Sequence, residues 1–221
     1  MTTTPDFERA ATAAAETLVN FEINSAPVAP LPILKRTPHV LVFSYEEVSE
    51  SIDQKRSCVL ATVGERNQDA FTTVSIINGT PHYIVTYNQL LPAFLVQRAL
   101  ARELGHIVLG HDGSRPESVR LDEARAFANH LLAPRALIHT IQATGIRITK
   151  EVLGNLTGCY DYCLSCMRKI PPVHVPAELN RQIRQNYMPF VLNYFDYQRY
   201  ASKKDGSESV DFGTFMEGYE E

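Results

Sequence analysis

The sequence predicts an α+β fold in which a small, mostly antiparallel sheet is followed by several helices. Three observations support this prediction. Short runs rich in β-branched and aromatic residues fill residues 39–87, and an Asn-Gly pair separates two of them. Longer runs with apolar residues at helical spacing flank this region. The chain has 221 residues, 44% hydrophobic and 21% charged, a composition typical of globular proteins.

The N-terminal part, residues 1–37, is predicted to contain one helix and a connector. Residues 6–21 are alanine-rich and carry apolar residues at helical spacing, which favours a helix. The following segment, EINSAPVAPLPILKRTP, contains four prolines. Because proline fixes φ and has no N–H to donate, we expect this segment to be an extended connector.

The predicted sheet is built from the runs HVLVFSY, SCVLATV, FTTVSIING and HYIVTY. Their β-branched and aromatic residues fit a half-buried pleated surface. Asn78 and Gly79 separate the last two runs. Both residue types accept positive φ, so this pair predicts a tight hairpin.

Helices are predicted after the sheet. The segment YNQLLPAFLVQRALARELGHIVLGHDG indicates a helix that begins near Pro92 and ends at Gly110. Arg102, Glu103 and His106 lie on one face of it, away from its apolar positions. Further helices are predicted over about 119–132, over 149–170 and over 176–199, the last with a kink or break at a proline, residue 189.

After the connector we expect a main domain (38–137), a helical extension with a cysteine cluster (138–200) and an acidic, disordered tail (201–221). The negative charge is concentrated in the tail. The tail holds six acids and two lysines, which accounts for the whole net charge of -4. A formally neutral body lacks the basic surface of a nucleic-acid binder, so no direct nucleic-acid binding is expected.

Localisation follows from two further features of the sequence. No apolar run approaches the ~20 residues of a membrane span. The first residues, MTTTPDFERAATAAAET, do not have the charged-then-apolar pattern of a secretory signal. We therefore expect a cytoplasmic protein without a membrane partner.

The segment ALARELGHIVLGH, residues 99–111, is close to the His-Glu-x-x-His pattern of zinc-protease helices. In that pattern residues four apart lie one above the other, so both imidazoles reach one ion. The glutamate between them takes a proton from the metal-bound water. Here Arg102 stands in place of the first histidine. A guanidinium is always protonated and has no lone pair for a metal.

Three blocks, YNQLLP, ELGHIVLGH and EARAFANHLLAP, resemble those of the ImmA/IrrE family of metallo-endopeptidases. The resemblance covers about residues 6–137. It implies a zincin-like fold, zinc as cofactor, and a helix-turn-helix repressor, often on a mobile element, as substrate or partner in transcriptional regulation. Glu103 matches the general base and His106 the second histidine ligand. We choose Glu123 as the carboxylate ligand.

The arginine makes the implied zinc site degenerate. We expect Arg102 to replace the ion, with its guanidinium paired with Glu123 and with Glu103. His111 points off the ligand face unless the helix ends at Gly110 and the chain turns back. The sequence therefore predicts a metallopeptidase-like regulatory protein with weak or absent catalysis. The alternative is an active zinc endopeptidase with substitute ligands.

Three cysteines, Cys159, Cys163 and Cys166, fall at i, i+4 and i+7 of a predicted helix and share one face. One interpretation is packing in the core, because free cysteine buries readily. The other is a second site, for a metal or for redox chemistry, completed by Cys58 or His174. A cysteine-metal or redox sensor is therefore a third functional hypothesis.

Overall fold

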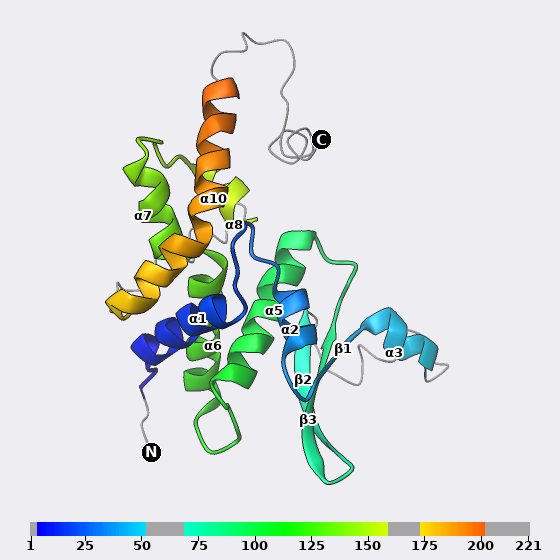
Figure 1. The fold of residues 1–221 in the computed structure, drawn as a ribbon. Helices are drawn as coiled ribbons and strands as arrows, with labels where there is room; N and C mark the ends of the chain where they lie inside the picture. The colour runs from blue at the N-terminus through cyan, green and yellow to red at the C-terminus, as the bar shows by residue number, and fades with distance from the viewer. Residues whose placement is uncertain (1–3, 52–68, 159–172, 202–221) are drawn as a thin grey trace.

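An α+β arrangement of helices around a small sheet is present in the computed structural model, which describes residues 4–51, 69–158 and 173–201. This confirms the predicted fold class (Figure 1). The elements are α1 (Phe7–Asn20), α2 (Pro30–Arg36), β1 (Val40–Ser44), α3 (Tyr45–Ser51), β2 (Ala70–Ile77), β3 (Thr80–Tyr87), α5 (Ala93–Val108), α6 (Glu117–Leu132), α7 (Arg135–Ala143), α8 (Lys150–Thr157) and α10 (Ala177–Ala201).

The described strands form one sheet in the order β1-β3-β2. The hairpin between β2 and β3 turns at Asn78 and Gly79, which have φ of 51° and 79°, as the Asn-Gly pair predicts. β1, however, pairs with β3 in parallel over five residue pairs, whereas β2 and β3 pair antiparallel over eight, so the described sheet is mixed. β1 is joined to β2 by a long connection and not by a hairpin, which leaves its direction free. The run SCVLATV lies outside the described residues.

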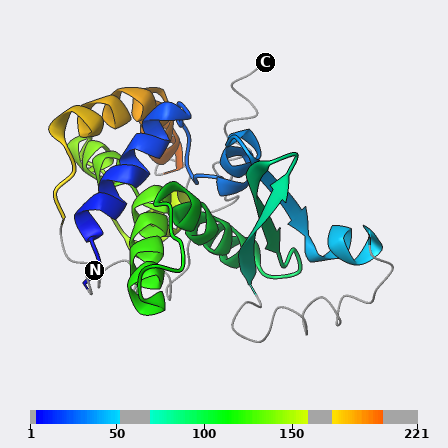
Figure 2. The same cartoon turned by 90° about the horizontal axis from the view of Figure 1, so that it is seen from below.

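Helix α5 is the central element. Figure 2 shows the sheet on one side of it and helices α1, α6 and α10 on the other. Leu100 and Leu104 on its apolar face are 1% and 0% exposed. On the α6 side the helices approach closely at Gly105, where an added Cβ would be 3.0 Å from Phe127 Cδ1. The polar residues Arg102, Glu103 and His106 lie on the side of α5 that faces the β2–β3 hairpin.

The N-terminal helix belongs to the core. α1 packs on α6 and α10, and Ala10, Ala14 and Leu18 are at most 1% exposed. Its small alanine side chains allow the helices to approach closely, since interiors are close-packed. Near the other end of the chain, α10 continues through Pro189. The helix changes direction in Figure 1, as expected where proline removes a backbone hydrogen bond.

Two expected segments differ in the structure. The proline-rich connector contains α2, because Pro30 occupies its first turn, where no amide donor is needed. The helix predicted over 149–170 is α8 in its first part and ends at Thr157, where Gly158 takes a φ of 63°. All four cysteines lie outside the described residues, and so does the acidic tail from residue 202 onward. No helix in the described ranges is long and apolar enough to cross a membrane.

Candidate functional site

The end of α5 turns the chain back on itself. Gly110 has a φ of 60° and donates its amide to the Ile107 carbonyl at 3.0 Å. The His111 amide donates to the carbonyl of His106 at 2.9 Å. These two bonds form a Schellman motif, which glycine favours because it has no Cβ. The turn brings the His111 ring beside that of His106, with centroids 5.0 Å apart.

The turn creates a chain of polar contacts that links α5 to α6. His106 Nδ1 lies 2.9 Å from His111 Nδ1. The other nitrogen of that ring, His111 Nε2, lies 2.9 Å from Glu123 Oε2. His111 therefore bridges the histidine and the carboxylate that the sequence assigned to a metal. Within the described part of the chain, the hydrogen-bond path from His106 to Glu123 runs through His111.

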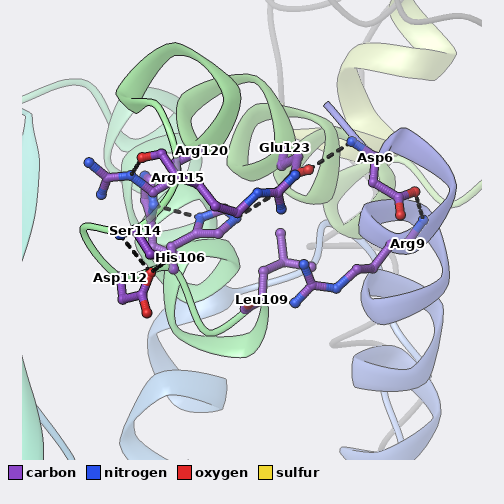
Figure 3. Close-up of polar contacts among 10 residues, drawn as sticks. Asp6, Arg9, His106, Leu109, Asp112, Ser114, Arg115, Arg120 and Glu123 are labelled. Atoms are coloured by element: carbon purple, nitrogen blue, oxygen red, sulfur yellow. Dashed lines mark hydrogen bonds and ion pairs between the residues drawn. The ribbon is translucent and has the colours of Figure 1, made fainter. Parts of the chain in front are cut away.

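Glu123 is buried beneath α1. Its side chain is 1% exposed, and it accepts hydrogen bonds from the Asp6 amide at 2.7 Å and from Arg115 Nη1 at 2.8 Å. Figure 3 shows the contact between Glu123 and Asp6, the N-cap residue of α1. Arg9 of α1 lies beside Leu109 and donates to its carbonyl. Burial raises the pKa of Glu123, but the bonds from Asp6, His111 and Arg115 outweigh this effect and lower it. Glu123 is therefore ionised at neutral pH.

The protonation of the two histidines follows from this carboxylate. Burial lowers the pKa of His111, and it lowers that of His106 to about 4 with help from His111, Arg102 and Arg120. Both rings are thus neutral near pH 7. Because an ionised Glu123 can only accept, His111 Nε2 carries its proton and donates. His111 Nδ1 must then accept from His106 Nδ1, which leaves His106 Nε2 unprotonated.

Arg102 and Glu103 form a second group of polar contacts, next to the first residues of β2. Arg102 Nε lies 3.3 Å from Glu103 Oε1, and its Nη2 donates to the Ala70 carbonyl at 3.3 Å. Thr72 of β2 donates to Glu103 Oε2 at 2.9 Å. The expected pair of Arg102 with Glu123 is not formed among the described residues, since the latter is paired with Arg115. Burial raises the pKa of Glu103, although Arg102 and Thr72 oppose the rise.

A cleft of about 560 Å³ lies between the hairpin, α5 and α6. Glu103, His106 and Arg102 line it, so the structure brings these predicted residues together, but the buried Glu123 is not part of the lining. Its walls combine apolar and charged side chains. The remaining lining residues are Phe71, Thr72, Val74, Tyr83, Ile107, His111, Glu117, Arg120, Leu121 and Arg125.

In this arrangement the side chains predicted as zinc ligands are bonded to one another or to other protein groups. The described residues contain no group of three His, Cys, Asp or Glu side chains placed to hold a metal. The nitrogens of His111 point at two different partners, so one ion cannot replace both contacts. Both oxygens of Glu123 accept hydrogen bonds. Arg102 and Arg120 add positive charge near His106, where a divalent cation would be repelled.

Sequence reasoning missed several contributors to the site. His111 was expected to point off the ligand face unless the helix ended at Gly110. The helix does end there, and the Schellman turn returns His111 toward it. Thr72 and the amide of Asp6 gave no comparable signal, since their contacts with Glu103 and Glu123 join residues 31 and 117 positions apart. No sequence pattern singled out Arg115, although it lies eight residues before Glu123. No family model, curated protein or solved structure matches the chain.

Proposed function

We propose that this chain is a metallopeptidase-like regulatory protein that binds an extended segment of a partner protein in the cleft and does so without a metal ion. The observation that carries the proposal is the charge around His106. Arg102 and Arg120 line the cleft together with His106, so two cations lie near the position where the family resemblance implies zinc. A helix-turn-helix repressor is the partner class that the ImmA/IrrE resemblance implies.

The hairpin supports binding of an extended segment. β2 lies at the edge of the described sheet, and its residues Thr72 and Val74 line the cleft. An edge strand offers backbone N–H and C=O groups to an incoming chain, as in β-augmentation. Val74 and Ile76 are 62% and 65% exposed, so they offer apolar contact to alternate side chains of that segment.

The cleft also offers a cation to an acidic side chain of the partner. Arg120 donates its Nε to the Arg115 carbonyl at 3.2 Å, and no carboxylate in the described ranges forms an ion pair with it. Arg102 and Arg125 are already paired, with Glu103 and Asp122 respectively. Complementary charge at a binding surface increases the association rate and the specificity of recognition.

The metal-free part of the proposal is tested by elemental analysis of protein purified without chelating resin and then dialysed against zinc. We expect far less than one zinc per chain for the wild type. Arg102→His should increase the zinc content, because it removes a cation and adds an imidazole one turn before His106. Arg98→His places a histidine one turn earlier on the same helix and is the matched control. Stoichiometric zinc in the wild type contradicts the proposal.

The binding part is tested with a helix-turn-helix repressor encoded beside the gene for this chain. We expect the wild type to bind the repressor without cutting it, and Arg120→Gln to weaken binding about fivefold to tenfold through the loss of one charge contact. Arg181→Gln removes an arginine paired with Glu178 on α10 and should leave binding unchanged. If the wild type cleaves the repressor and Glu103→Gln stops the cleavage, the active zinc endopeptidase is the better hypothesis.

A further inference from the structure

We propose that the C-terminal segment of this chain, residues 202–221, occupies the same cleft intramolecularly. The proposal concerns the regulation of the site and rests on the proposed function for its consequence, which is competition with the partner segment. The occupancy itself depends only on the chemistry of the cleft and of this segment. It can therefore be tested with the chain alone.

The C-terminal segment reads SKKDGSESVDFGTFMEGYEE. From residue 205 onward it carries six acids and no base. Large apolar side chains are interleaved with these acids. They are Val210, Phe212, Phe215, Met216 and Tyr219. The segment thus combines negative charge with apolar surface, whereas the rest of the chain is formally neutral.

The cleft has the complementary chemistry. Three arginines and two glutamates line it, together with apolar side chains from the hairpin, α5 and α6. The carboxylate of Glu103 is engaged by Arg102 and by Thr72. Arg120 is therefore the cation to which a carboxylate of the C-terminal segment pairs. The nearby Val74 and Leu121 contact its apolar side chains.

The length of the C-terminal segment is sufficient. Twenty extended residues span up to ~66 Å. A folded domain of this chain's length has a radius of gyration of roughly 17 Å and is therefore about 45 Å across. α10 ends at one end of the molecule and the hairpin protrudes at the other (Figure 1). Residues 215–221, which hold two of the three aromatic side chains of the segment and three of its six acids, are the part that reaches the cleft.

Because the C-terminal segment is part of the same chain as the cleft, a weak contact is sufficient for it to occupy the cleft. A segment joined to its own binding site acts at an effective concentration on the order of millimolar. A contact with a dissociation constant near 1 mM between separate molecules is then substantially populated within one chain. A partner segment must displace it, so the C-terminal segment sets a threshold for partner binding.

The test is photo-cross-linking of the full-length chain with benzoylphenylalanine in place of Val74, which is 62% exposed and lines the cleft. We expect mass spectrometry of the monomer to find cross-links to residues 205–221. Arg120→Gln in the same chain should reduce their yield severalfold, and so should high salt, since the attraction is electrostatic. The same probe at Met188, 42% exposed on α10, is the positional control.

Two results would overturn the inference. One is the absence of cross-links between β2 and residues 205–221 in the monomer. The other is a cross-link that joins two chains only, which would place the segment in a second copy. Neither result depends on the repressor, so failure of this inference leaves the binding test of the proposed function intact. Loss of repressor binding with the cross-link retained would refute the proposed function alone.

Discussion

His111 Nε2 lies 2.9 Å from Glu123 Oε2, and this contact makes the carboxylate part of a buried hydrogen-bond chain. The chain continues to His106, which lines the cleft, while the carboxylate itself lies beneath α1. The side chain predicted to hold a metal thus joins α1, α6 and the end of α5. Its removal should affect folding more than it affects binding at the cleft.

Glu123→Gln is expected to lower the free energy of unfolding by about 2–4 kcal/mol, because three donors lose an ionised partner in a buried position. Chemical denaturation measures this change. Asp122→Asn alters the adjacent carboxylate, which is 45% exposed and paired with an exposed arginine, and should change stability by less than ~0.5 kcal/mol. Equal effects of the two substitutions would show that Glu123 does not stabilise the fold.

Gly110→Ala is expected to cost about 1 kcal/mol in the free energy of unfolding. The glycine has a φ of 60°, which a Cβ disfavours, although no atom lies within 4 Å of the added Cβ. Gly113→Ala is the matched control, because it also meets no atom within 4 Å and its φ is not positive. Thermal unfolding of both variants distinguishes backbone strain from a general effect of alanine.

Gly105→Ala should destabilise the protein by about 1–3 kcal/mol through overpacking between α5 and α6. The added Cβ would lie 3.0 Å from Phe127 Cδ1 and 3.2 Å from the Ala124 carbonyl oxygen. Combining it with Phe127→Leu should restore part of the loss, because the smaller side chain gives room. A stable Gly105→Ala protein with unchanged denaturation midpoint would contradict the close approach of the two helices.

The stability of the fold should decrease on acidification below pH 6.5. The pKa of His106 is lowered from 6.5 to about 4, so in this range the unfolded chain binds a proton that the folded chain does not. The contribution of His106 to the free energy of unfolding is fully present above pH 6.5 and is lost as the pH falls to about 4. His106→Gln should reduce the loss by about 1–3 kcal/mol. The pKa of His130 is also lowered to about 4, so this residue titrates in the same pH range. Because His130 remains in the His106→Gln variant, part of the loss of stability on acidification remains as well.

Local sequence signals predicted the elements that local interactions specify. α1, the Asn78-Gly79 hairpin, α5 and α6 were all predicted, because helical periodicity and turn chemistry act over a few residues. The parallel pairing of β1 was not predicted, since strand direction depends on a partner more than thirty residues away. α2 was missed because its prolines were interpreted as breakers, although Pro30 fits the first turn of a helix.

By itself, the sequence determined the α+β class and placed Arg102, Glu103 and His106 on one face of α5. Only the tertiary structure decided the partners of these side chains. The Schellman turn at Gly110 and the docking of α1 set the contacts of Glu123, because its donors come from segments up to 117 residues apart. Helical spacing fixes where a side chain lies on its helix, whereas the partner it meets depends on how the helices pack.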